Sequence, residues 1–254
     1  MIVATEQPTH WYRPDGSSAY GSTLREARGE KLLPSVTTVT SLLAAPGLEA
    51  WKQSELVMAA LTMPESEKSE DLNVLAKQIV AESKRAGKDA ANLGTQVHDQ
   101  CEAILRNGTW EKNLMTEAVY AWVLENVKSV KWCEKTLVDN LVGYAGRADA
   151  LIDHVEHGLT LIDWKTQKFK KQKKGFKPIF YNKWILQLAA YSECIGKPVR
   201  CISVAINTKA ESEDDIIVVD KLWSEEEQED GYHQFLNLHS LWCWDRNYSP
   251  VDQG

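Results

Sequence analysis

Residues 146–165 read GRADALIDHVEHGLTLIDWK, and they predict two antiparallel strands joined by a short turn. Gly158 would supply the left-handed conformation at the end of a three-residue hairpin loop. Side chains two positions apart in a strand share one face, so Asp163 and Lys165 point to the same side. An odd loop length brings Asp149 to that face as well, opposite Lys165 and diagonal to Asp163. The hairpin therefore predicts two carboxylates and one amine at a single place.

This cluster is costly unless something compensates it, because neighbouring acids repel and buried charges lose their hydration. A divalent cation such as Mg²⁺ or Mn²⁺ compensates carboxylates, acidifies a bound water and neutralises charge that develops on a phosphate. Lys165 would stand beside the ion as a point charge that positions the water and stabilises the same anion. The alternative is a surface hairpin with an incidental ion pair, and spacing alone leaves both open.

The surrounding pattern predicts an α/β fold with a mixed central sheet flanked by helices. Strands are expected at 133–141, 146–155, 159–165, 199–206 and 216–220. Helices are expected at 48–62, at 72–106 with a break near Gly87, at 114–132, at 181–195 as a crossover, and at 224–244. Short strands are expected around Asp15-Gly16, and Ser35 or Thr37 should cap a helix. The acidic stretch 65–71 suggests a boundary between a mostly helical N-terminal appendage, 1–66, and a core, 67–254.

Composition is that of a globular protein without a membrane segment. Hydrophobic residues make up 43% of the 254 residues, charged residues 26%, and no apolar run approaches the roughly 20 residues that a span needs. The N-terminus resembles neither a signal nor a transit peptide, so we expect a cytoplasmic protein. Five cysteines without a CxxC pair argue against a disulfide framework, a zinc ribbon and an iron–sulfur cluster. They are Cys101, Cys133, Cys194, Cys201 and Cys243.

A lysine-rich segment follows the hairpin directly. Residues 165–177 contain seven lysines and no acid, whereas 22 basic and 36 acidic residues remain elsewhere. Such a basic rim on an acidic body would bind a phosphate backbone in a salt-dependent, sequence-independent manner, although lysines that merely aid solubility are the alternative. The expected DNA-binding residues are Lys168, Lys170, Lys171, Lys173, Lys174 and Lys177. Aromatic residues that could stack on unpaired bases are Trp164, Phe176, Tyr181 and Trp184.

Taken together, these motifs resemble the PD-(D/E)XK nuclease superfamily, and specifically its RecB-like exonuclease branch. That branch includes phage exonucleases and the mitochondrial genome maintenance exonuclease. The resemblance covers nearly the whole chain, with the motifs in the family's order. PSVTT at 34–38 resembles a segment seen upstream in the exonucleases, GTQVH ending at His98 resembles GxxxH, GRAD ending at Asp149 resembles GxxD, DWK ending at Lys165 is the DxK motif, and QLAAY from Gln187 to Tyr191 resembles QxxxY.

The resemblance implies a restriction-endonuclease-like core and a DNA exonuclease that uses Mg²⁺ or Mn²⁺. The implied metal ligands are His98, Asp149, Asp163 and the backbone carbonyl of Trp164. A lone helical histidine is otherwise most often a satisfied core residue. Glu102, one turn after His98, would be an outer neighbour of the site, and Glu134 is a candidate extra acid for which a surface strand charge is the preferred interpretation.

The implied catalytic residues act on the phosphate and the attacking water. Gln187 and Tyr191 lie four apart on one helix face, so both can reach the site, although a buried polar pair that ties the helix to the sheet is the alternative. The implied catalytic set is Asp149, Asp163, Lys165, Gln187 and Tyr191.

Several functions share this chemistry. The expected substrate is DNA with free ends, with a phage recombination protein or a single-strand-binding protein as a possible partner. A double-strand exonuclease and a single-strand end trimmer both fit. The alternatives are a structure-specific endonuclease, a catalytically silent DNA-binding module of the same fold, or a scaffold for a protein partner.

Overall fold

A computed structural model of the chain describes residues 10–172, 175–212 and 214–251. It divides the chain into two compact units. The first joins residues up to Leu42 with those from Gln100 onward, and the second holds Leu43–Asp99. The division between 1–66 and 67–254 that the sequence suggests does not coincide with these units. The N-terminal segment packs with the sheet because its short strands and helices bury Trp11, Leu32 and Val36 in the same core.

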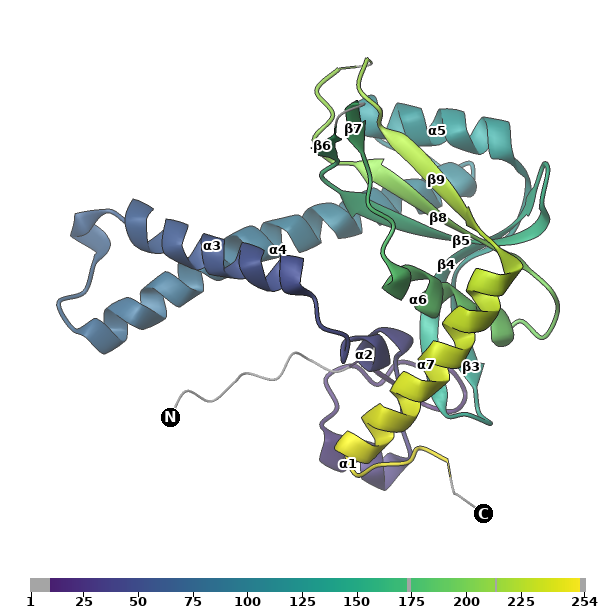
Figure 1. The fold of residues 1–254 in the computed structure, drawn as a ribbon, viewed down its shortest axis with the longest axis horizontal. Coiled ribbons are helices and arrows are strands. Elements are labelled where there is room, and N and C mark those ends of the chain that lie inside the picture. The colour runs from purple at the N-terminus through teal and green to yellow at the C-terminus, as the bar shows by residue number, and fades with distance from the viewer. Residues whose placement is uncertain (1–9, 173–174, 213, 252–254) are drawn as a thin grey trace. The chain divides into compact units, whose positions relative to one another are not determined.

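The centre of the first unit is a mixed sheet of five strands (Figure 1). In spatial order the strands are β3 (Val127–Asp139), β4 (Tyr144–His154), β5 (Gly158–Gln167), β8 (Arg200–Asn207) and β9 (Val218–Trp223). Neighbours are antiparallel except β5 and β8, which are parallel. A parallel pair needs a crossover connection, and α6 (Asn182–Glu193) supplies it. The predicted α/β fold with a mixed sheet is confirmed.

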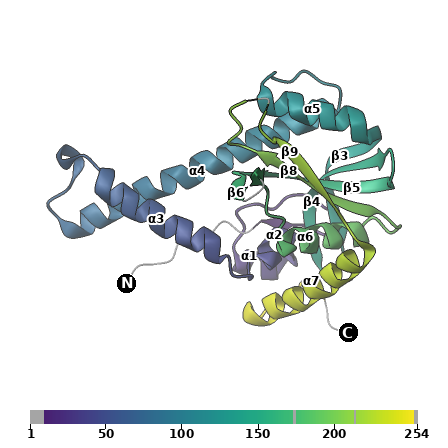
Figure 2. The ribbon, with the colours of Figure 1, turned by 45° about the horizontal axis from the view of Figure 1, so that its top comes forward.

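Helices cover both faces of this sheet (Figure 2). Helix α5 (Leu114–Asn126) packs on one face, against β3, β8 and β9. On the opposite face α6 packs against β4, β5 and β8, and α7 (Glu225–Asp245) packs against α6. Parallel strands buried on both faces require apolar side chains on both, as the run of buried residues along β8 shows.

The N-terminal segment extends the α6 side of the sheet. Strand β1 (Trp11–Tyr12) pairs with β2 (Leu33–Pro34), with α1 (Leu24–Glu30) between them, and α2 (Val36–Thr40) follows. The predicted cap at Ser35 is confirmed, because its hydroxyl accepts the Thr38 amide at 3.0 Å.

The second unit is helical, and one prediction about it is wrong. It contains α3 (Pro46–Thr62), the short helix η1 (Glu65–Glu67) and most of α4 (Leu72–Leu105). Helix α4 runs through Gly87 without the expected break. A Cβ at Gly87 would lie 3.8 Å from the ring of Trp51 on α3, so packing against this ring covers the glycine and offsets its cost of about 1 kcal/mol.

One element boundary and one pair of strands also differ from the sequence prediction. The helix expected at 114–132 ends at Asn126, and β3 begins at Val127, because residues 127–133 pair with β4, with two register shifts. The lysine-rich segment contains two short antiparallel strands that the sequence did not predict, β6 (Lys170–Gln172) and β7 (Gly175–Lys177). Among the described residues, no helix combines the length and apolarity that crossing a membrane requires.

Candidate active site

The β4–β5 hairpin brings the two predicted aspartates to one face. Pairing runs from His154–Gly158 to Ala150–Ile162, so the loop is 155–157 rather than 156–158, and Gly158 adopts φ +68°. The expected pairing of Asp149 with Lys165 is therefore wrong. Continued by one position, the observed register sets Asp149 opposite Asp163. The loop keeps its odd length, which is why the shared face survives the shift.

Asp149 ends the backbone ladder between these strands. Its Oδ2 accepts the backbone N–H of Trp164 at 2.7 Å, beyond the last paired residues of the hairpin. Burial and the neighbouring Asp163 carboxylate raise the pKa of Asp149 to about 7, while Lys165 opposes the shift. The protein therefore holds a carboxylate where burial and a neighbouring acid make a negative charge costly.

Lys165 is held by two side chains. Its Nζ lies 2.9 and 2.8 Å from the two carboxylate oxygens of Asp163, and 3.1 Å from Oε1 of Gln187 on α6. Asp163 is only 3% exposed. The close approach of Lys165 to Oδ2 of Asp163 does not form a hydrogen bond, so this buried oxygen keeps lone pairs that a cation could use.

Tyr191 completes the α6 side of the site, one turn after Gln187. A Cβ at Gly146 would lie 2.7 Å from both Cε1 and the hydroxyl oxygen of Tyr191, so the first glycine of GRAD makes room for this ring. Tyr191 is 3% exposed, and burial raises its pKa well above the ordinary value, helped by both site aspartates. Its hydroxyl stays protonated and can donate a hydrogen bond within the site.

A second possible metal ligand lies close to Asp149. Ligand atoms of Glu134 and Asp149 lie within 4.8 Å of each other. The family resemblance implied His98 and Asp163 as ligands beside Asp149. His98 lies on α4, in the second unit.

Glu134 is the residue that the sequence interpretation undervalued. It lies on β3 between the pairs Cys133–Ala150 and Lys135–Ala148, so the register sets it opposite Asp149. Its side chain is 17% exposed, which is low for a surface charge, and its carboxylate pairs with Arg147. Its φ of +52° is a left-handed conformation that costs a non-glycine residue roughly 1–2 kcal/mol. Such strain accumulates at functional sites, but nothing in the sequence signals it.

Glu102 has a structural partner. Its carboxylate accepts from Arg106 at 2.7 Å, and Arg106 also donates to the carbonyl of Cys133 at 3.1 Å. Glu102 thus helps to join the end of α4 to β3, next to Glu134.

Trp164 points away from the cluster, as alternation along a strand requires. Its indole is 2% exposed and packs edge to face on Trp122 of α5, with ring centroids 5.4 Å apart. Trp122 in turn donates to Asp220 at 2.8 Å. The Trp164 backbone, not its ring, therefore faces the site.

The predicted DNA-binding lysines are described only in part. Lys168 and Lys177 are exposed. Lys170 and Lys171 belong to β6, and Phe176 belongs to β7. Lys173 and Lys174 lie outside the described residues.

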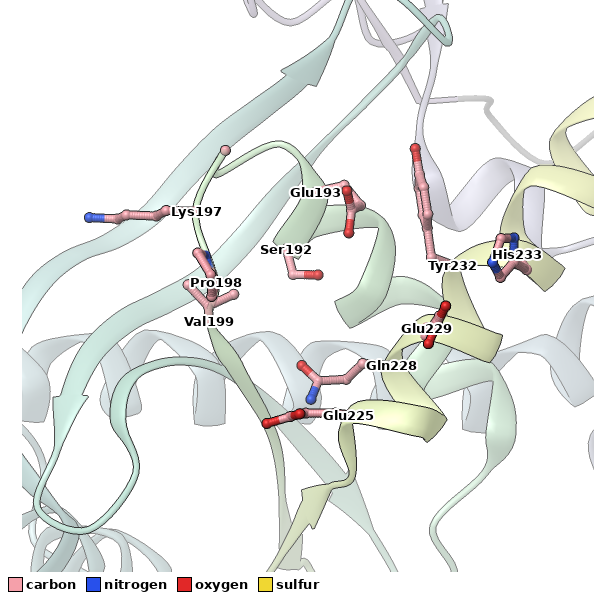
Figure 3. Close-up of a pocket in the computed structure, with 11 residues that line it drawn as sticks. Ser192, Glu193, Lys197, Pro198, Val199, Glu225, Gln228, Glu229, Tyr232 and His233 are labelled. Atoms are coloured by element: carbon pink, nitrogen blue, oxygen red, sulfur yellow. The ribbon is translucent and has the colours of Figure 1, made fainter.

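A separate cavity of about 400 Å³ opens between the end of α6 and the first turns of α7 (Figure 3). It contains none of the predicted site residues. Its charged lining includes Glu193, Lys197, Glu225 and Glu229. Because its lining includes no residue of the aspartate cluster, the cavity is a separate feature. Glu225 in this lining pairs with Arg200.

Comparisons with known proteins add no family. No family model matches the sequence, and no curated protein matches it. A solved structure titled "Crystal structure of SSO0001" is similar over 82% of this chain and 90% of that chain, with 15% sequence identity and a TM-score of 0.32. A likeness at that score carries no argument about fold or function.

Proposed function

We propose that this protein is a divalent-metal-dependent nuclease that hydrolyses DNA from its ends, built on a restriction-endonuclease-like core. The observation that carries the proposal is the position of Asp149. Its ligand atoms lie within 4.8 Å of those of Glu134, and it lies on the same face as the ion pair of Asp163 and Lys165. Three carboxylates and an amine converge from three strands, as metal-assisted phosphodiester hydrolysis requires.

The residues present fit a hard divalent cation. Asp149 has a pKa raised to about 7 by burial and by Asp163, and Asp163 keeps an oxygen without a hydrogen bond. A cation would relieve both costs. Glu134 and Asp149 would hold the ion, with Asp163 on the adjoining side, and the family resemblance adds His98. Oxygen ligands with one imidazole suit Mg²⁺ and Mn²⁺. When bound, the ion would supply a Lewis acid and an acidified water.

The remaining side chains would act on water and phosphate. Asp163 and Gln187 hold the Lys165 amine in one place, so its charge can stabilise the anion that forms at the phosphate without reorganisation. Gln187 accepts from Lys165, which leaves the Gln187 amide N–H groups able to donate to a phosphate oxygen. The protonated Tyr191 hydroxyl would help to orient Gln187.

DNA as the substrate, and its ends as the point of attack, are supported by the lysine-rich segment and by the resemblance to RecB-like exonucleases. Exposed Lys168 precedes the paired strands β6 and β7 that follow Lys165, and exposed Lys177 is the last residue of β7. Lysines so placed would bind a phosphate backbone on its way to the site. A role in recombination, repair or replication, beside an annealing or single-strand-binding protein, belongs to the same proposal.

The test compares end-labelled linear DNA with closed circular DNA, each with Mg²⁺, Mn²⁺ or EDTA. We expect the parent protein to degrade linear DNA only when a metal is present, and Asp163→Ala and Lys165→Ala to lose at least about a hundredfold in rate. Asp153→Asn is the matched control, because Asp153 lies on β4 but pairs with Lys131 and Ser129 instead. It should retain full activity.

Three other outcomes of this test would contradict all or part of the proposed function. Equal degradation by the parent, Asp163→Ala and Lys165→Ala would indicate a contaminating nuclease and end the proposal. Cutting of the closed circle would replace an exonuclease with an endonuclease. Binding without cleavage in every metal would indicate the silent DNA-binding module.

A further inference from the structure

An exposed aromatic ring lies beside the candidate active site. The Nζ of Lys165 is 5.9 Å from the ring centroid of Trp184 on α6, and the ring centroid of Tyr181 is 5.4 Å from that of Trp184. The Tyr181 ring therefore lies within about 11 Å of the amine, since these two distances bound their separation. Tyr181 is 47% exposed, whereas Trp184 is 8% exposed.

We propose that Tyr181 is a stacking platform for an unpaired base, so the substrate is a single-stranded DNA end. This inference rests on the proposed nuclease function, which it deepens by naming the substrate class. An aromatic face binds the π-face of a base only when that base is not stacked in a duplex. A platform within about 11 Å of the Lys165 amine thus favours a strand whose terminal bases are free.

The structure selects Tyr181 among the aromatic candidates. Trp164 and Trp184 are buried, at 2% and 8% exposure, and the side chain of Phe176 lies outside what is described. The buried ring of Trp184 packs against the ring of Tyr181. Both Tyr181 and Phe180 meet it edge to face, with interplanar angles of 73° and 85°. The ring of Tyr181 is therefore held in place at low entropic cost before any base arrives.

Local stability does not explain a tyrosine at this position. Tyr181 is the N-cap of α6 and makes no side-chain cap hydrogen bond. Side chains cap other helices of the described part of the chain, among them those of Thr23, Ser35, Asn113 and Ser224. A polar N-cap side chain typically stabilises a helix by about 1 kcal/mol, and α6 lacks this contribution. A binding role for the exposed ring accounts for this choice.

The test measures binding of labelled single-stranded oligodeoxythymidine by fluorescence anisotropy in EDTA, where the metal-dependent cleavage is absent. Tyr181→Ala should weaken the Kd by about tenfold, the loss expected for one stacked base, and Tyr181→Phe should stay within about twofold because it keeps the ring. Tyr120→Ala is the control, since Tyr120 is 37% exposed on α5, across the sheet.

Two further probes separate stacking from general loss of affinity. A blunt duplex of the same length should bind the parent and Tyr181→Ala equally. An oligonucleotide whose terminal sugars lack bases should bind the parent as weakly as it binds the variant. Equal single-strand affinity of parent and Tyr181→Ala, or the same loss on all three DNAs, would overturn the inference.

Failure of this inference and failure of the proposed function give different results. If the parent cleaves linear DNA with Mg²⁺ but Tyr181→Ala binds single strands normally, only the platform is wrong. If the parent never cleaves DNA but Tyr181→Ala selectively loses single-strand affinity, the platform stands in a binding module and the nuclease proposal is wrong.

Discussion

Replacing Gly146 with alanine should destabilise the protein through a single contact. The added Cβ would lie 2.7 Å from Cε1 and from the hydroxyl oxygen of Tyr191, and 3.1 Å from Cζ. Ordinary contacts begin near 3.4 Å, so the overlap is about 0.7 Å. Neither partner can move easily, because Gly146 of β4 is paired with Leu137 of β3 and Tyr191 is 3% exposed. Overpacking of this kind costs about 1–3 kcal/mol.

The assay is chemical and thermal unfolding of a double-mutant cycle. At about 2 kcal/mol, Gly146→Ala should lower the Tm by roughly 4–8 °C for a chain of this size. In a Tyr191→Leu background, where the long ring is gone, the same change should cost less than about 0.5 kcal/mol. Gly29→Ala is the matched control, since Gly29 lies in α1 with nothing within 4 Å of its Cβ position, and it should be neutral or stabilising. Additive effects at positions 146 and 191 would refute the reasoning.

Three other outcomes follow from particular contacts. Glu134→Gln should weaken Mn²⁺ binding by about tenfold in calorimetry while leaving the far-ultraviolet circular dichroism unchanged, and undiminished binding would remove Glu134 from the ligand group. Burial lowers the pKa of His239, whose Nε2 lies 3.1 Å from the Gly143 carbonyl, so the stability it contributes is lost as pH falls below its ordinary value of 6.5. His239→Gln should therefore lose less stability than the parent between about pH 7 and about pH 5, and parallel pH profiles would contradict this. Trp122→Phe should lose the donor to Asp220 and cost about 1 kcal/mol, or roughly 2–4 °C in Tm; an unchanged Tm would show that this hydrogen bond adds nothing.

Much of the candidate site could be predicted from local periodicity. Asp163 and Lys165 share a face because a strand repeats every two residues, and Trp164 points away for the same reason. Gln187 and Tyr191 share a face because a helix returns after four residues. These relations depend only on neighbours along the chain, so the sequence contains them.

The sequence predicted one strand register and one helix break incorrectly. The turn between β4 and β5 is displaced by one residue, which sets Asp149 against Asp163 instead of Lys165. The break expected at Gly87 is absent, since a ring from another helix packs on it. Propensity is a weak preference that tertiary contacts override when they bury a favourable surface.

By itself, then, the sequence determined the order of elements, the two aspartates and the lysine on one hairpin, and the polar pair on the crossover helix. Only the tertiary structure decided that Glu134 lies opposite Asp149, that Gly146 makes room for Tyr191, and that Tyr181 is exposed while Trp184 is buried. The physical reason is the separation along the chain over which each effect acts. Periodicity acts between residues a few positions apart, whereas register, burial and strain are set by segments that meet only when the whole sheet and its helices pack together.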